Sequence, residues 1–208
     1  MARRTRLERA TLRIGIWYSI QLSYRRIDFV IIPHLRPIVK AFWKKSRKIF
    51  APERTTMEMI STVTDSVEQT EQVAATLARE LIERGEGDAF LALYGDLGAG
   101  KTAFVRGLAS VVAPKDAVCS PTYTVVNEYR SGEVTLCHFD MYRITSEEDL
   151  ISIGFYDYTD CMIAVEWSEN VPYALPEHYY RVTLTKLAAA EGEYDSGKRT
   201  ILVEEIAP

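Results

Sequence analysis

The sequence has few of the residues that build metal centres and disulfide frameworks. Among its 208 residues there are only three cysteines and three histidines. Cys119, Cys137 and Cys161 form no C-x-x-C pair, and no histidine has ligand spacing with another histidine or with a cysteine. We therefore expect neither a zinc site nor a disulfide. We interpret the cysteines as small buried side chains in a reducing compartment.

A long apolar run is also missing. Two apolar stretches near the start, residues 14–18 and 29–32, are short, with Arg25 and Arg26 between them and Pro33 after them. No window of about 20 apolar residues is available for a membrane span. No small-residue cleavage site follows a clean apolar core, so a secretory signal is not supported either. We expect a cytoplasmic protein whose main domain does not cross a membrane.

Each part of the chain is poor in charge of one sign. Residues 1–56 hold 14 Lys and Arg but only three acidic residues, and the remainder holds 11 basic and 26 acidic residues. Net charges of +11 and −15 thus lie behind the overall −4. Segments of such opposite character are not expected to form one folding unit. We predict a basic N-terminal extension over residues 1–56 and a folded domain over residues 57–208.

Three interpretations of the extension stay open. Its basic and aromatic residues are suited to contact with anionic lipid or nucleic acid. Its richness in arginine is also found in organellar presequences. Finally, it is explained by a start codon assigned too far upstream, with Met57 or Met59 beginning the native protein. The last interpretation has the most weight, because the regular pattern from Ile60 onward is complete without this segment.

From Ile60 the sequence alternates between strand and helix patterns. A helix begins at Asp65 or Ser66, with Glu68 or Gln69 as the capping-box partner. We expect strands at 60–64, 89–94, 125–129, 134–139, 162–165, 180–187 and 199–205, and helices at 66–85, 102–112 and 146–153. This order predicts an α/β fold, the three-layer sandwich of P-loop NTPases. Its central sheet is expected to be mostly parallel, with antiparallel strands at the edges.

One glycine-rich loop carries a strong chemical signal. It satisfies the pattern G-x-x-x-x-G-K-[ST] and reads Gly95-Asp96-Leu97-Gly98-Ala99-Gly100-Lys101-Thr102. Such glycines let backbone N–H groups turn inward around a phosphate. Lys101 can neutralise phosphate charge, and the Thr102 hydroxyl can bind Mg²⁺. An apolar strand before the loop and a helix after it supply the context that the motif requires, so we predict a nucleotide site.

Two acidic residues follow apolar strands and complete this prediction. Asp140 ends the strand that begins at residue 134, and Glu166 ends the strand that begins at residue 162. Ligands gather at the carboxyl ends of strands in open α/β sheets, which makes both carboxylates candidates for a metal and water site. Thr122, in the run Ser120-Pro121-Thr122-Tyr123-Thr124, has the position of a switch loop whose hydroxyls reach phosphate or Mg²⁺. We interpret Trp167 as a core residue.

Four blocks follow one another along the domain: residues 93–102, 120–124, 138–143 and 165–167, with the acidic stretch 147–150 and Gly154 between the last two. In their order and spacing they closely resemble the TsaE family, formerly called YjeE. The resemblance covers about residues 59–206 and leaves out residues 1–56.

The resemblance implies a bacterial ATPase needed for the threonylcarbamoyl modification of the adenosine next to the tRNA anticodon. It implies ATP and Mg²⁺ as ligands and the proteins TsaD and TsaB as partners. By the same resemblance, residues 95–102 bind the phosphates, and Thr102 and Glu166 hold Mg²⁺. Lys101, Asp140 and Glu166 are the expected catalytic residues. Thr70 and Arg199 match positions in the nucleotide pocket.

Other observations agree with this reading of the family and limit the alternatives. No N/T-K-x-D motif follows the strand that ends at Glu166, which argues against a GTPase. No clear arginine finger lies in a predicted loop, so we expect slow intrinsic hydrolysis that a partner accelerates. The net charge of −15 disfavours direct tRNA contact. Two other functions stay open: a small-molecule kinase on the same scaffold, and a nucleotide-dependent interaction module that does not hydrolyse ATP.

Overall fold

The computed structural model describes residues 54–188 and 195–208. The chain divides into two units, and the second, Glu53–Pro208, contains all of these residues. The predicted basic extension therefore lies outside the described residues, except for the last few positions before residue 57. Within the described ranges, no helix combines the length and the apolar character that crossing a bilayer requires.

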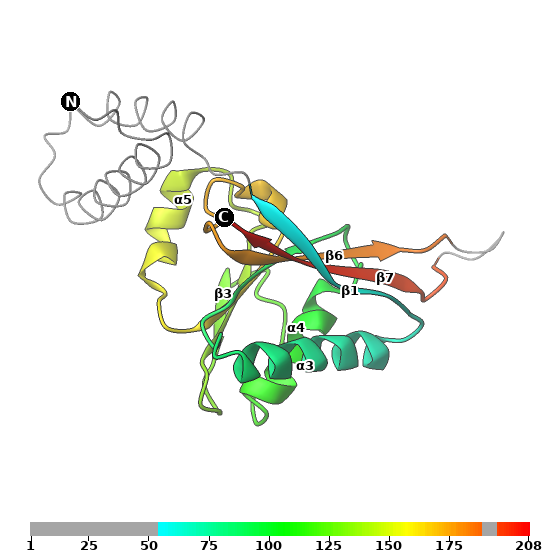
Figure 1. Cartoon of the computed structure of the whole chain (residues 1–208). Helices are drawn as coiled ribbons and strands as arrows, with labels where there is room; N and C mark the ends of the chain where they lie inside the picture. Colours follow the sequence, from blue (N-terminus) through cyan, green and yellow to red (C-terminus); the bar gives the residue numbers. More distant parts are fainter. Residues whose placement is uncertain (1–53, 189–194) are drawn as a thin grey trace, which may run out of the picture. The chain divides into compact units, whose positions relative to one another are not determined.

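One seven-stranded mixed sheet forms the centre of the second unit (Figure 1). Its strands are β1 (Thr55–Thr64), β2 (Phe90–Tyr94), β3 (Val126–Tyr129), β4 (Leu136–Asp140), β5 (Met162–Glu166), β6 (Tyr179–Lys186) and β7 (Arg199–Ala207). The order across the sheet is β1-β7-β6-β2-β5-β4-β3. The four inner strands β6, β2, β5 and β4 run parallel, and β3, β7 and β1 join antiparallel at the edges. This confirms the expected mixed α/β sheet with parallel inner strands.

The helices begin where the sequence places caps. They are α3 (Val67–Glu83), α4 (Lys101–Val112) and α5 (Glu147–Ser152), with 3-10 turns η2 (Phe155–Asp157) and η3 (Ser168–Asn170). Ser66 is the N-cap of α3 and accepts from Gln69 N, while Gln69 accepts from Asp65 N, which resolves the alternatives left by the sequence. Ser146 and Asp149 form a complete capping box at α5.

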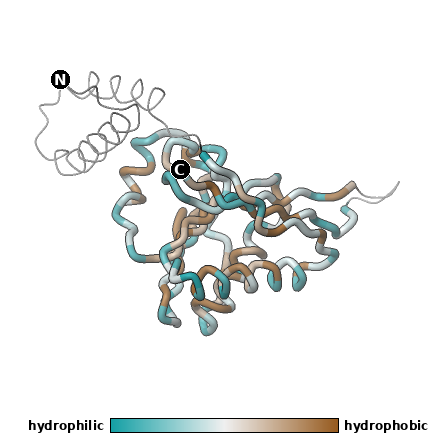
Figure 2. Tube along the Cα trace, in the orientation of Figure 1, coloured by the Kyte–Doolittle hydropathy of each residue, from teal (hydrophilic) through white to brown (hydrophobic). Residues whose placement is uncertain are grey.

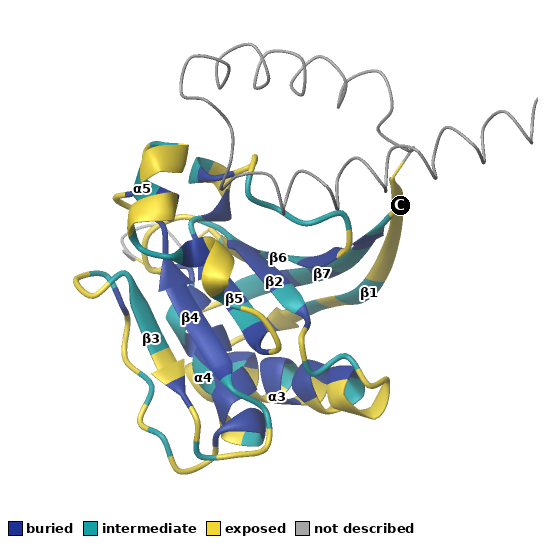
Figure 3. Cartoon of the chain, turned by 90° about the vertical axis from the view of Figure 1, so that its left-hand side faces the viewer, coloured by how far each residue is buried: buried dark blue, intermediate teal, exposed yellow. Residues whose placement is uncertain are grey.

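Helices α3 and α4 cover one face of the sheet, and α5 with η2 covers the other (Figure 1). Along α3, apolar and polar residues alternate around the helix (Figure 2), so one side is buried against the sheet. Figure 3 shows the inner strands as mostly buried and β1 as mostly exposed. Strands β2 and β5, which have both faces covered, consist almost wholly of apolar residues, whereas β6 alternates apolar with polar residues.

Three details differ from the sequence-based expectation. Strand β1 begins at Thr55 and not at Ile60, since residues 55–58 pair with the end of β7. The folded unit therefore includes residues that the prediction had assigned to the extension. Cys119 is exposed, whereas Cys137 and Cys161 are buried free thiols with their sulfur atoms 3.2 Å apart. The interpretation of all three cysteines as buried was thus wrong for Cys119.

Candidate nucleotide site

The glycine loop, residues 95–102, connects the carboxyl end of β2 to the first turn of α4. Gly95, Gly98 and Gly100 have φ angles of +137°, +73° and +106°, which L side chains rarely adopt. A Cβ at Gly95 would also lie 2.2 Å from the backbone oxygen of Leu184 on β6. Only glycine therefore permits this turn against the neighbouring strand. The side chains of Asp96 and Leu97 are exposed, and Ala99 is buried.

Lys101 is folded back into the centre of this loop. Its Nζ donates to the backbone oxygens of Gly95 and Asp96, the latter at 3.1 Å. The same ammonium lies 3.8 Å from the centre of the Trp167 ring. Only 4% of the residue is exposed, and this burial lowers the pKa of Lys101, against the attraction of the Glu166 carboxylate. A desolvated cation at a helix N-terminus is a strong attractor for an anion.

Glu166 lies opposite the loop and connects three elements. Thr102 Oγ1, in the first turn of α4, donates to Glu166 Oε1 at 2.8 Å. His138 Nε2, on β4, lies 2.9 Å from the same oxygen. Glu166 and His138 are both buried. Because Thr102 uses its proton on the carboxylate, a lone pair of its hydroxyl oxygen stays free for a cation.

Asp140 lies beside Glu166 at the ends of adjacent parallel strands, since the two residues are partners in the β4–β5 register. Thr122 Oγ1 donates to Asp140 Oδ2 at 2.8 Å, and Tyr142 N donates to Oδ1 at 2.9 Å. The loop containing Thr122 is tied to the strand end further by Val125, whose oxygen accepts from Asp140 N at 3.0 Å. The β-branched Val125 has a φ of +68°, a strained conformation of the kind that clusters at functional sites.

Thr70 and Arg199 approach the loop from two further elements. Thr70 on α3 is buried, shares a 3.0 Å hydrogen bond with Thr64, and lies next to Gly100. Arg199 at the start of β7 donates to the backbone oxygen of Gly98 at 3.2 Å and forms two 2.8 Å hydrogen bonds with Asp195. The structure thus brings every sequence-predicted site residue to one end of the sheet.

Two residues of this cluster received no role from the sequence. His138 occurs in the block 138–143, and it lies two residues before Asp140, so both side chains project from the same face of β4. That spacing was the available signal. Trp167 packs against a hydrophobic cluster, as the core interpretation expected, but its ring also faces the Lys101 ammonium and lies 5.1 Å from the Tyr142 ring. No sequence pattern indicates this contact.

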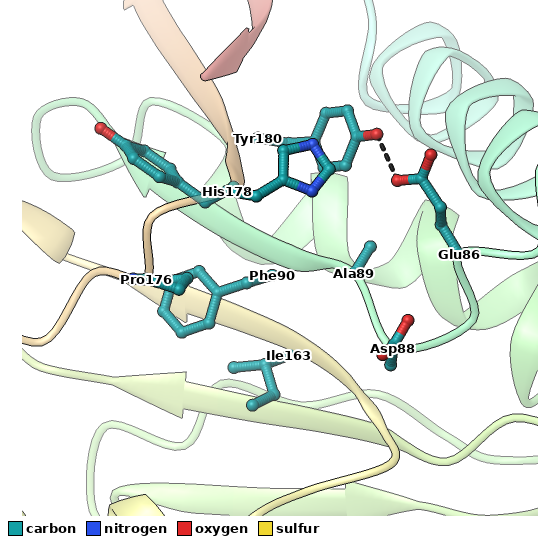
Figure 4. A pocket seen from close by; sticks show the side chains of 9 residues that line it. Glu86, Asp88, Ala89, Phe90, Ile163, Pro176, His178 and Tyr180 are labelled. Carbon is teal, nitrogen blue, oxygen red and sulfur yellow. Dashed lines mark hydrogen bonds between the residues drawn. The ribbon is translucent and has the colours of Figure 1, made fainter. Parts of the chain in front are cut away.

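A hollow lies at the opposite, amino ends of β2 and β6 (Figure 4). It has a volume of about 290 Å³ and contains none of the predicted site residues. Tyr180 donates to Glu86 across its upper side, and Phe90, Ile163 and Pro176 form an apolar wall. His178 at its rim lies 3.0 Å from Glu205. Of the charged groups that line it, Asp88 is exposed and Glu86 is half-buried.

The donor set around the glycine loop suits a hard cation. Thr102 and Glu166 present oxygen atoms, which Mg²⁺ prefers, and Mg²⁺ commonly takes only one or two protein ligands besides phosphate and water. Within residues 54–188 and 195–208, no group of three or more His, Cys, Asp and Glu side chains is arranged to hold a metal. The site is therefore not a ready-made protein cage for a transition metal.

Fold and site together define an α/β protein with one mixed sheet and a polar cluster around a glycine loop at the carboxyl ends of its parallel strands. The family model of "Threonylcarbamoyl adenosine biosynthesis protein TsaE" matches residues 64–201. The chain belongs to the TsaE family, which the resemblance in the sequence had indicated.

Individual relatives agree with this assignment. A tRNA threonylcarbamoyladenosine biosynthesis protein TsaE from Nostoc is 41% identical over 45% of this chain, and the match spans 60% of that protein, less than two thirds of its length. The TsaE protein of Treponema pallidum is 39% identical over 56% of this chain and 84% of its own. The crystal structure of Bacillus subtilis YdiB superimposes with a TM-score of 0.54 at 25% identity, covering 71% of this chain and 86% of YdiB.

Proposed function

We propose that this protein binds and hydrolyses ATP in support of the threonylcarbamoyl modification of tRNA, and that its fold is that of the P-loop NTPases. The observation that carries the proposal is the contact between loop and strand. Thr102 Oγ1 donates to Glu166 Oε1 at 2.8 Å, directly beside the buried ammonium of Lys101. A hydroxyl and a carboxylate held together next to a phosphate loop are the parts that nucleotide hydrolases use to hold Mg²⁺.

The loop binds the phosphates in this proposal. The first backbone N–H groups of α4 have no partner within the helix and attract anions, aided by the helix dipole. Lys101 leaves the backbone oxygens of Gly95 and Asp96 and donates to phosphate oxygen in their place. This exchange replaces neutral acceptors by charged ones, which strengthens each hydrogen bond. Arg199 and Thr70 border the rest of the nucleotide.

Mg²⁺, when bound, would neutralise phosphate charge as a Lewis acid. Thr102 and Glu166 are the residues that would hold it. Asp140 is aligned beside Glu166 in the strand register and is oriented by Thr122 and by Tyr142 N. Each of its oxygens accepts one of these hydrogen bonds and keeps a lone pair. Asp140 is therefore suited to orient a water molecule for attack on the terminal phosphate.

The proteins TsaD and TsaB are the proposed partners, on the ground of family membership. The acidic character of the folded domain supports protein partners over direct tRNA contact, because phosphate contact needs a basic face. Among the described arginines, Arg199 is the one that hydrogen-bonds to the glycine loop, and it is also bound to Asp195. Because no other arginine is in place to stabilise the transition state, we expect slow intrinsic hydrolysis.

The test is steady-state ATP hydrolysis by the full chain, alone and with TsaB and TsaD, beside the variants Lys101→Ala and Glu166→Ala. We expect stimulation by the partners, and its loss in either variant. Nucleotide binding without any stimulation would remove the proposed role and favour a kinase or a non-hydrolysing interaction module. Equal hydrolysis with and without the partners would refute the expectation of partner control.

A further inference from the structure

His138 is a buried polar residue that the proposed function leaves without a role. None of its surface is exposed, and its Nε2 lies 2.9 Å from Glu166 Oε1. Among the described residues, its Nδ1 is the only buried side-chain nitrogen or oxygen that has no hydrogen-bond partner. An apolar side chain at this position would leave no such atom unsatisfied. Burial of the imidazole therefore costs free energy, and its contact with Glu166 is its one hydrogen bond among the described residues.

The two oxygens of Glu166 have different surroundings. Oε1 receives both the Thr102 hydroxyl and the His138 ring nitrogen. Oε2 accepts no hydrogen bond from a described residue, and the side chain as a whole is 5% exposed. One oxygen is thus held from two sides, by α4 and by β4, while no described residue donates to the other.

We propose that His138 is a positioning residue that fixes the Glu166 carboxylate in the orientation needed to hold the divalent cation of a bound nucleotide. This inference rests on the proposed function. A carboxylate at the end of a strand can rotate about its side-chain torsions. A single hydrogen bond from Thr102 leaves part of this rotation free, and the second hydrogen bond, from His138 on the neighbouring strand, restricts it further. Partners of metal-binding groups act in this way throughout metalloproteins.

The geometry also assigns the donor of this hydrogen bond. A carboxylate oxygen can only accept, so the proton of the pair lies on Nε2 of His138. The ring therefore donates to Glu166 Oε1 from β4, as the Thr102 hydroxyl does from α4.

The test measures how binding of a fluorescent, non-hydrolysable ATP analogue to the full chain depends on Mg²⁺. We expect His138→Leu to raise the Mg²⁺ concentration at half-saturation by about 10- to 100-fold, the usual effect of losing a partner of a metal ligand. Binding of the analogue in excess chelator should stay at the wild-type level. His138→Gln places an amide N–H near the position of Nε2 and should restore most of the Mg²⁺ response. His178→Leu, at the other end of the sheet, serves as the control.

A wild-type Mg²⁺ response in His138→Leu would overturn the inference. So would an equal loss in His138→Gln and His138→Leu when both unfold at the wild-type temperature. If the leucine variant does not fold, His138→Asn replaces it, because its shorter amide cannot reach Glu166; equal responses of the Asn and Gln variants then overturn the inference. A wild-type chain whose nucleotide binding ignores Mg²⁺ would overturn the proposed function itself, and this inference with it.

Discussion

The two ends of the parallel strands differ in how deeply their charged side chains are buried. At the carboxyl ends, Lys101, His138, Asp140 and Glu166 are buried around the glycine loop. At the amino ends, around the hollow of Figure 4, the charged side chains of Glu86 and Asp88 are half-buried or exposed, and the His178 side chain is 44% exposed beside Glu205. Burying charge is costly unless each group has a partner. At the carboxyl end the charged groups can be buried because the loops that follow several parallel strands meet there and bring partner groups together.

This difference indicates which residues serve ligand binding and which serve the stability of the fold. The polar groups of the carboxyl end hold one another in place through Glu166 and Asp140 and leave atoms free for a ligand. At the amino end, Tyr180 donates to Glu86, and His178 contacts Glu205. Substitutions at the first end should therefore change ligand binding, and substitutions elsewhere should change the free energy of unfolding.

The largest effect is expected for Lys101→Ala. Loss of a charged donor to phosphate costs about 1.5–3 kcal/mol per hydrogen bond, so ATP binding measured by calorimetry should weaken by roughly 100-fold or more. The free energy of unfolding should not fall, because burial already disfavours the charged form of Lys101. Lys115→Ala, which removes an exposed lysine beyond the far end of α4, is the matched control. Unchanged ATP affinity in Lys101→Ala would contradict the assignment of ligand binding to the carboxyl ends of the strands.

Gly107→Ala should act on stability alone. A Cβ on this residue of α4 would lie 2.2 Å from the backbone oxygen of Glu71 and 2.7 Å from Ala74 Cβ, both on α3. Forcing the helices apart should lower the free energy of unfolding by about 1–3 kcal/mol. The sign is diagnostic, since alanine in place of glycine stabilises an open helix by roughly 0.5–1 kcal/mol. Denaturant titration measures the change, and a stabilised variant would contradict the close α3–α4 contact.

Tyr180→Phe should lower the free energy of unfolding by about 1 kcal/mol through loss of the hydrogen bond to Glu86, with ATP binding unchanged. Burial and the Glu86 carboxylate raise the pKa of the Tyr180 phenol. The folded state therefore holds this proton more tightly than the unfolded state does. The stabilisation is complete below the pKa of an unfolded tyrosine, near 10, and is lost as the pH rises above it. Unfolding at a series of alkaline pH values should show the wild type approaching the variant. A constant difference would contradict this.

The smallest effect is expected for Arg199→Lys. Its contacts with Gly98 O and Asp195 lie near the surface, where such pairs contribute about 0–1 kcal/mol. ATP affinity should fall only a few-fold, measured beside Arg199→Ala. A loss of ATP affinity as large as that of Lys101→Ala would show that the ligand-binding part of the sheet extends to β7. The division between the two ends of the sheet would then be wrong for this strand.

Much of the site was predictable because its signals are local. The glycine loop, the helix after it and the strands ending in Asp140 and Glu166 all follow from short patterns of residue type. The inner strands β2 and β5 follow from their continuous apolar runs, but the parallel pairing of the alternating strand β6 with β2 does not. The start of β1 was missed because residues 55–58 are exposed and carry no apolar alternation; pairing with β7 alone makes them a strand. The burial state of Cys119 likewise depends on a loop, not on a pattern.

The contacts that give the site its chemistry are of another kind. The sequence by itself determined which donors and acceptors are available and at which ends of which strands they occur, since backbone conformation and burial depend on neighbouring residues. Tertiary structure alone decided that His138 and Thr102 share one oxygen of Glu166, and that Lys101 faces Trp167. Those pairs join residues far apart in the chain, and their distances depend on strand order and register, which no local pattern encodes.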